Sequence, residues 1–369
     1  MRRIYEYLHI ATLDRYIIGK YLSAFFFSVL LFSLISMAID FSDKVQIFIE
    51  RNCTLKNVLF DYYPGFVLHI TGLLLPLYVL IATVFFTSRM AFNAEILSIL
   101  NAGVGFARLL RPYLIACGMI MVLHLALSHF VIPKANKARL LFERTFVWTD
   151  KQQVKNNNIH FFVSPNVKAY LRGYDKGSKR ITTLRLEQYA GSRLVSLMEA
   201  DNADWIDSTK TWRMNRYWVR EFDGLKERYQ FYDTPKDTAL NAEPNDFISY
   251  HNSNEEMTTG ELMAAIRKEE KRGFANTRTF AIEVHRRTAD AFTGLILTVI
   301  GLAVAGRKAR GGMGFHLAIG IGLGALFILL SKFSVTFAAS GSIPVMLGMW
   351  IPNIMFAGVA LALASRAQK

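Results

Sequence analysis

The sequence has few of the residues on which enzymes and disulfide-rich domains depend. Its 369 residues include only two cysteines, Cys53 in a polar loop and Cys117 inside an apolar run, so neither a disulfide framework nor a thiolate metal site is expected. The eight histidines show no HExxH pattern, and no complete P-loop is present, since Gly19-Lys20 is followed by Tyr21. We therefore expect no catalytic residues, no metal site and no cofactor, with any ATP hydrolysed by another chain.

What the sequence has in excess is apolar surface and positive charge. Hydrophobic residues make up 52% of the chain, the net charge is +14 and the mean hydropathy is +0.23. This combination indicates a membrane protein with cationic flanks. The bases are spread along the chain rather than gathered in one stripe, so nucleic acid is not an expected partner. The first apolar run is too long for a signal peptide and has no Ala-x-Ala exit, which predicts a retained helix.

Six apolar runs are long enough to cross a bilayer, which takes about 20 helical residues. The fourth run is short and carries Asp290, so we expect it to continue a helix through 276–288. Short alternate loops carry the bases, which places both termini and the 87–112 loop in the cytoplasm and residues 132–275 on the far side. The predicted spans are 21–39, 66–86, 113–131, 289–305, 315–337 and 345–363.

The long insertion between the third and fourth runs has a different periodicity. From about 159 to 235 apolar and polar residues alternate, as in ITTLRLEQY (181–189), LVSLMEA (194–200) and TWRMNRYWVREF (211–222). Turn residues separate these segments, which predicts an antiparallel sandwich or open barrel. After Thr258 a helical period returns and is expected to end at Gly273. The expected organisation is 1–131 with three spans, 132–258 as an all-β domain, and 259–369 with a linker helix and three spans.

The loop between the second and third runs reads NAEILSILNAGVGFARLLRP (93–112). Gly103 and Gly105 are expected to break a short helix over about 91–104 before Pro112 opens the next span. The segment is either a plain connector or a helix that lies along the membrane and docks in a groove of a partner.

Within that helix, Ile96, Leu97 and Leu100 are expected near one face and Glu95 on another. Glu95 is either a solvated acid, whose ion pair would be worth about 0–1 kcal/mol, or a partly desolvated contact to a partner.

Several segments, taken in order, resemble the LptF/LptG (YjgP/YjgQ) permeases, the membrane part of the lipopolysaccharide exporter. The resemblance covers nearly the whole chain, and the region MAIDFSDKVQIFIE (37–50) is more similar to LptG-type members. The matching segments are LDRYIIGKYL (13–22), AEILSILNAGVGFARLLRP (94–112), VIPKANKARLLFE (131–143), EADNADW with TWRM (199–214), EVHRRTADAF (283–292) and MWIPNIMF (349–356).

The resemblance implies a fold and a set of partners. The β domain would be a periplasmic jellyroll, and the chain would pair with a second LptF/LptG-type permease above an LptB-like ATPase dimer in the inner membrane of a Gram-negative bacterium. Lipopolysaccharide would pass through the jellyroll to LptC/LptA-like proteins. The ATPase-coupling residues would be Glu95, Ile96, Leu100 and Gly103.

Four cations are candidates for contact with the anionic substrate: Lys44, Lys332, Arg286 and Arg287. A lysine at membrane depth, such as Lys332, faces a cavity or partner, or else its side chain extends to the membrane surface. Lys44 follows Asp40 and Asp43 at the end of the first span. Either it contacts the substrate together with bases of the partner permease, or divalent cations bridge the two acids to phosphate, or the segment is an ordinary solvated helix end.

The charged run over 283–290 allows two interpretations. Glu283 and Arg287, and likewise Arg286 and Asp290, have the i,i+4 spacing of helix ion pairs, which favours a self-paired helix. The alternative is a hinge that lines the substrate entry.

Two other classes of function remain possible from the residues alone. A membrane-anchored sensor or interaction module would use the β domain without transport, although it would need neither six spans nor an acidic cytoplasmic helix. An intramembrane enzyme would need a nucleophile dyad, paired aspartates or a zinc motif within the spans, and none is evident. Co-purification of a separate ATPase separates the transporter from both alternatives.

Overall fold

A computed structural model of the chain describes residues 12–148, 157–240, 242–244, 253–271, 277–306 and 312–367. The chain divides into two compact units: one spans 1–147, 255–260 and 278–369, and the other spans 148–254 and 261–277. The first unit is helical and the second contains the strands. The protein is thus a helical membrane bundle with an antiparallel β domain inserted in its sequence.

Six helical segments are long and apolar enough to cross a membrane. Each contains one of the six predicted spans, so that prediction is confirmed. Their main helices are α2 (Thr12–Glu50), α4 (Tyr63–Phe92), α6 (Phe106–Ala126), α10 (Arg278–Ala305), α11 (Gly312–Ser340) and α12 (Val345–Ala367).

Short helical pieces, some of them with the wider turns of a π-helix, extend the second and third spans. α3 (Leu55–Asn57) and η1 (Val58–Tyr62) precede α4, and η2 (Leu127–Val131), α7 (Ile132–Phe142) and η3 (Glu143–Val147) follow α6. The pieces η1, η2 and η3 are π-helical, a geometry that is often found at functional sites and that leaves no simple periodic signal in sequence.

One expected helix start is wrong. Pro112 does not open the third span, because α6 begins at Phe106 and Pro112 lies buried inside it. A proline removes only one backbone hydrogen bond, and packed neighbouring helices allow membrane helices to tolerate it. The expected end of the helix after Thr258, at Gly273, lies outside the described residues; α9 is described over Thr259–Lys271.

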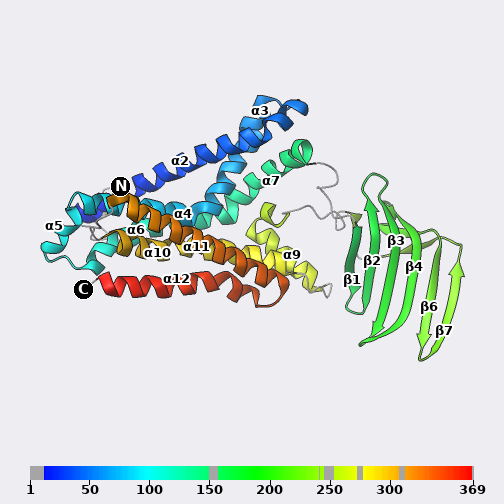
Figure 1. Cartoon of the computed structure of the whole chain (residues 1–369). Helices are drawn as coiled ribbons and strands as arrows, with labels where there is room; N and C mark the ends of the chain where they lie inside the picture. The colour runs from blue at the N-terminus through cyan, green and yellow to red at the C-terminus, as the bar shows by residue number, and fades with distance from the viewer. Residues whose placement is uncertain are drawn as a thin grey trace. The chain divides into compact units, whose positions relative to one another are not determined.

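Close helix contacts at glycine hold the bundle together. A Cβ on Gly301 of α10 would lie 2.8 Å from Thr83 Cγ2 of α4, and one on Gly65 of α4 would lie 2.5 Å from the Ala135 carbonyl oxygen of α7. These separations are shorter than van der Waals contact, so only glycine lets the helices approach so closely. In Figure 1 the start of α2, the end of α12 and the short helix α5 lie at one end of the bundle, and α3 and the end of α7 lie at the other.

The β unit is one antiparallel sheet, in which β1 to β5 pair in sequence order, β6 pairs with β4 and β7, and β8 pairs with β5 (Figure 1). β4 pairs with β3 on one side and with both β5 and β6 on the other. The strands are β1 (Asn157–Ser164), β2 (Val167–Asp175), β3 (Arg180–Ala190), β4 (Arg193–Ile206), β5 (Thr211–Met214), β6 (Tyr217–Asp223), β7 (Lys226–Tyr232) and β8 (Lys236–Thr238).

The segment predicted as one strand, 211–222, is interrupted by a bend but keeps one register. Ala203 pairs with Met214 in β5, and Ala200 pairs with Tyr217 in β6, so the three-residue step along β4 equals the step along the partner. β5 and β6 therefore act as one strand opposite β4, and the sheet is an open meander.

One face of this sheet carries the core of the β unit. Trp212 is fully buried and donates its Nε1–H to the Ala242 carbonyl oxygen over 2.8 Å. Leu171, Ile181 and Leu184 lie in the same apolar cluster. The alternation seen in the sequence is the alternation between this face and the other.

Candidate functional site

The predicted coupling segment folds as a short helix, α5 (Glu95–Asn101), between α4 and α6. Two residues with left-handed backbone bound it: Ala94 with φ of 59° and Gly103 with φ of 83°. Gly103 has no Cβ to strain, whereas Ala94 adopts a conformation that is uncommon for a residue with a side chain. Gly103 therefore acts through the backbone, by ending the helix.

The faces of α5 differ from the expectation at one residue. Ile96 is 2% exposed and packs in the bundle core, whereas Leu97 and Leu100 are exposed. The expected grouping of Ile96 with Leu97 and Leu100 is wrong, because in so short a helix Ile96 and Ile99 take the inward positions. The outward face presents Leu97 and Leu100.

Glu95 is half-buried at the first turn of α5 and is held by two donors. Tyr16 Oη of α2 donates to Glu95 Oε2 over 3.2 Å, and Asn93 Nδ2 donates to Oε1 over 3.3 Å. The carboxylate keeps acceptor capacity for a further donor, since an ionised carboxylate has about four lone-pair positions.

At the other end of the bundle, Lys44 lies in a polar cluster of the chain's own residues. Its Nζ is 2.7 Å from Asp40 Oδ1 and 3.5 Å from Glu143 Oε1, and it also contacts the Tyr62 hydroxyl, which donates to Asp40 over 3.0 Å. Lys44 thus ties α2 to η1 and η3. The nearby acid Asp40 is one of its ion-pair partners.

A second polar cluster holds the segment that leads into α9. Glu255 Oε2 lies 3.7 Å from His69 Nδ1 and 3.9 Å from Arg139 Nη2, and Glu256 pairs with Arg144. Arg139 also pairs with Glu143 at 3.2 Å, with both side chains less than one-tenth exposed. These contacts tie α4, α7 and η3 to the residues at 255–256.

The charged start of α10 forms one of the two predicted ion pairs. Arg287 Nε lies 2.9 Å from Glu283 Oε1, with each side chain 6% exposed. Arg286 Nη2 also pairs with Glu283, at 2.7 Å, and the expected Arg286–Asp290 pair is not formed among the described residues. Arg287 is enclosed in the bundle, so its first role is to hold α10.

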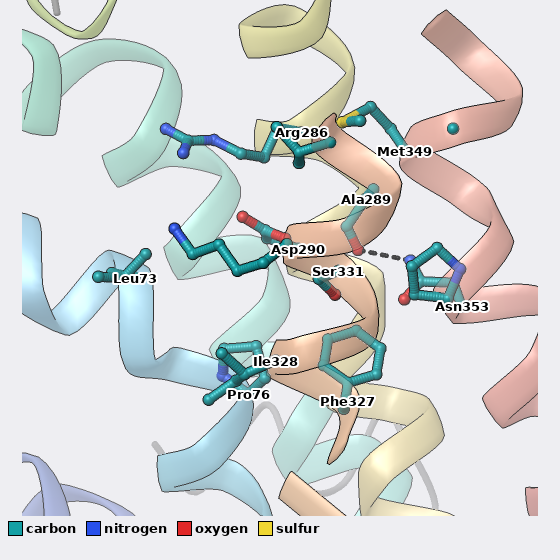
Figure 2. Close-up of a pocket in the computed structure, with 14 residues that line it drawn as sticks. Leu73, Pro76, Arg286, Ala289, Asp290, Phe327, Ile328, Ser331, Met349 and Asn353 are labelled. Atoms are coloured by element: carbon teal, nitrogen blue, oxygen red, sulfur yellow. Dashed lines mark hydrogen bonds between the residues drawn. The ribbon is translucent and has the colours of Figure 1, made fainter. Parts of the chain in front are cut away.

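An open cavity lies between α4, α10, α11 and α12. Its wall is mostly apolar, with Leu73 and Pro76 from α4 and Phe327 from α11, and Figure 2 shows Arg286 and Asp290 on successive turns of α10 beside it. Asn353 of α12 closes one side by donating to the Ala289 carbonyl oxygen over 2.8 Å.

A second cavity shares Leu73, Arg286 and Asp290 with the first and extends to His69 and His124. Polar groups are costly in a membrane unless they face a cavity or pair with one another. Here Asp290 faces the cavities, and Glu283 pairs with Arg286 and Arg287.

Lys332 lines the first cavity from α11. Its side chain is exposed and makes no hydrogen bond or ion pair with another described residue. Of the four predicted substrate cations, Lys332 and Arg286 line one cavity, Arg287 lies in the adjoining one, and Lys44 lies in the polar cluster with Asp40.

Two interactions have no counterpart among the predictions from the sequence: the ion pair between Asp14 of α2 and Arg108 of α6, which lie 94 positions apart, and the cluster around Glu255. For Arg139 and Glu143 a signal was present, since they have i,i+4 spacing within α7 and η3. Among the described residues, no group of three or more histidine, cysteine or acidic side chains is arranged to hold a metal ion.

Six apolar spans with charged residues turned to internal cavities, interrupted by a β domain, define a polytopic membrane protein of the transporter class. The sequence model of the lipopolysaccharide export system permease LptF/LptG family matches residues 15–366. That match covers nearly the whole chain, so the protein belongs to this family and is a multi-pass inner-membrane permease of lipopolysaccharide export. No curated protein matches the chain.

Proposed function

We propose that the chain is one permease subunit of an ABC-type exporter that extracts lipopolysaccharide from the outer leaflet of the inner membrane, driven by a separate ATPase. The observation that carries this proposal is the surface of α5, where Leu97 and Leu100 are exposed beside the half-buried acid Glu95. An apolar patch around one acid suits a partner groove that contains a basic residue. ATP is bound by the partner, and this chain contributes no cofactor site.

The topology supports the same assignment. α5 shares one end of the bundle with the start of α2 and the end of α12, as Figure 1 shows. Basic residues gather at the cytoplasmic side of membrane proteins, and Arg89, Arg108 and Arg111 flank α5. We assign both termini and α5 to the cytoplasm and the β domain to the periplasm.

The open sheet suits the proposed transfer to a periplasmic bridge. The edge strand β7 is exposed along its whole length, and Tyr229 and Phe231 of β7 are more than half exposed. An exposed edge can be extended by a strand of another β domain, as in strand addition. The partners are an LptB-like ATPase dimer, a second permease of this family and LptC/LptA-like bridge proteins, and we favour an LptG-type role for this chain.

The experiment is reconstitution of the chain with the second permease and the ATPase in vesicles loaded with lipopolysaccharide. Glu95→Ala is expected to lower ATP-dependent transfer by about tenfold or more, because losing one partner of a partly buried charge pair costs more than the 1.4 kcal/mol that a factor of about ten represents. Glu50→Ala, an exposed acid at the other end of α2, is the matched control and should transfer normally.

A different result would favour the sensor alternative. If the chain purifies without a stoichiometric ATPase, and Glu95→Ala transfers lipopolysaccharide as the unaltered chain does, the coupling role of α5 is wrong.

Lys332 is the proposed contact to an acidic group of the substrate, since it lines a cavity without an ion-pair partner among the described residues. Lys332→Glu should reduce photocrosslinking of lipopolysaccharide from α11 several-fold, because it replaces a cation by a second acid on the cavity that Asp290 already lines. Lys332→Arg keeps the positive charge and should crosslink normally. Equal crosslinking by both variants would mean that the lysine side chain extends to the membrane surface instead.

A further inference from the structure

The first turn of α2 contains a buried acid, Asp14, that has no role in the proposed function. Asp14 is 1% exposed and accepts two hydrogen bonds from Arg108 at the start of α6: Nη1 to Oδ1 over 2.6 Å and Nη2 to Oδ2 over 2.9 Å. Two parallel bonds between planar groups fix direction as well as distance. The pair therefore fixes the start of α2 against the helix that follows α5.

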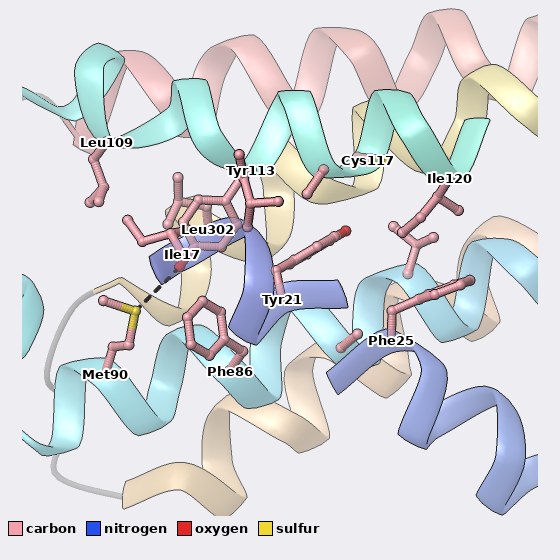
Figure 3. Packing of buried hydrophobic residues seen from close by; sticks show 14 of the residues in the cluster. Ile17, Tyr21, Phe25, Phe86, Met90, Leu109, Tyr113, Cys117, Ile120 and Leu302 are labelled. Carbon is pink, nitrogen blue, oxygen red and sulfur yellow. Dashed lines mark hydrogen bonds between the residues drawn. The ribbon is translucent and has the colours of Figure 1, made fainter. Parts of the chain in front are cut away.

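A second contact joins α2 directly to α5. Tyr16, about half a turn after Asp14, donates to Glu95 in the first turn of α5. Beneath these polar contacts, Ile96 of α5 packs in one apolar cluster with Ile17 of α2 and Leu109 of α6. Figure 3 shows Ile17 and Leu109 on neighbouring helices of this cluster. α5 is thus attached to α2 on its inner face and through the acid at its first turn.

After this attachment, α2 continues as a long helix with few buried residues in its second half. It has 39 residues, a length of about 58 Å at about 1.5 Å per residue. Tyr21 bonds Thr298 of α10 at 3.1 Å and Thr83 of α4 at 3.2 Å, but after Ser33 the next buried residue of α2 is Phe48. A long helix without a kink curves only gently, so a tilt at its first turn displaces its far end.

The far end of α2 has its own polar attachment. Lys44 pairs with Glu143, the first residue of η3, and the chain enters the β unit directly after η3. α2 is therefore tied by charge at one end to the neighbours of α5 and at the other to the helical piece that leads into the β domain.

We infer that Asp14 and Arg108 are a positioning pair that makes α2 move with α5, so that a displacement of α5 by the partner ATPase reaches the other end of the bundle through α2. This inference rests on the proposed coupling role of α5. In this role the pair needs no contact with nucleotide or lipopolysaccharide. Its effect is on how much transport each hydrolysis event produces.

The test is a double-mutant cycle on the amount of lipopolysaccharide transferred per ATP hydrolysed by the complete reconstituted complex. Asp14→Asn and Arg108→Gln should each lower this ratio by about fivefold or more, the lower end of typical coupling between distant sites. The double variant should be no worse than either single variant, because both changes break the same link.

Two controls separate a positioning role from simple damage. Arg213→Gln with Asp237→Asn removes an exposed pair in the β unit that is also joined by two hydrogen bonds, and should leave the ratio unchanged. Arg108→Lys keeps the charge but loses the paired geometry, so it should give an intermediate ratio even if a neutral variant fails to assemble.

The outcomes are distinct. If the unaltered complex shows no ATP-dependent transfer, the proposed function fails. If it transfers normally and the Asp14 and Arg108 variants keep its ratio, or if their effects multiply in the double variant, the positioning role is overturned while the proposed function stands.

Discussion

Charged residues are used in opposite ways by the two units of this protein. In the helical unit ion pairs are enclosed, as with Glu283 and Arg287, whose side chains are each 6% exposed. In the β unit they lie on strand surfaces, as with Arg213 and Asp237, which are 48% and 38% exposed. An enclosed charge depends on its partner, whereas water solvates an exposed charge that loses its partner. The bundle thus uses charge to fix helix positions, and the sheet depends mainly on its apolar face.

The largest expected effect comes from removing an enclosed acid. Glu283→Gln leaves Arg286 and Arg287 without their shared carboxylate and should lower the free energy of unfolding by about 3–5 kcal/mol. Denaturant titration of the purified protein in detergent measures this loss. Glu50→Gln makes the same chemical change at an exposed position and should be nearly neutral. Equal stability of the two variants would contradict the comparison.

A medium loss of stability is expected where α10 and α4 pack closely through uncharged residues. Gly301→Leu places side-chain atoms where a Cβ would already be 2.8 Å from Thr83 Cγ2, so the helices must separate, at a cost of about 1–3 kcal/mol. Gly322→Leu in α11 is the matched control, because a Cβ there meets nothing within 4 Å. If both variants melt at the same temperature, close helix approach at Gly301 is not what holds the bundle.

The smallest effect is expected in the sheet. Arg180 donates to Asp204 over 2.6 Å and holds the pKa of that carboxyl below its ordinary value. A carboxylate with a lowered pKa in the folded state stabilises the fold above its unfolded pKa of about 3.9, and this contribution is lost as the pH falls through the folded pKa. Asp204→Asn should therefore destabilise the β unit by about 0.2–1 kcal/mol near neutral pH.

This difference should shrink below about pH 4, where the carboxylate of the unaltered protein begins to protonate. Tryptophan fluorescence during heating reports it, since Trp205, Trp212 and Trp218 lie in the strands. Asp233→Asn, an exposed acid after β7, serves as the control. A loss for Asp204→Asn that grows in acid would contradict the sign.

The sequence predicts those parts of the fold that depend on local pattern. A span needs about 20 apolar residues in a row, and a half-buried strand needs alternation, so both units leave strong signals. The enclosed pair of Glu283 with Arg287 was also predictable, because both residues lie on one helix four positions apart.

Contacts between distant segments leave no such signal. Asp14 and Arg108 are 94 positions apart, and nothing in the sequence around either residue indicates the other. The burial of Ile96 could not be predicted either, because the pattern of a seven-residue helix does not say which of its apolar residues face inward. The ion pairs of Lys44 depend on η1 and η3, whose π-helical turns have no sequence period of their own.

The proposed function depends most on α5 and the sheet lying on opposite sides of the membrane. Single cysteines at Leu97 in α5 and Leu225 in the turn after β6, both exposed, can be labelled with a membrane-impermeant maleimide in cells carrying Cys53→Ser and Cys117→Ala. With this topology, Leu225→Cys is labelled once the reagent reaches the periplasm, and Leu97→Cys is labelled only after the inner membrane is opened. Labelling of both positions from the same side would contradict it.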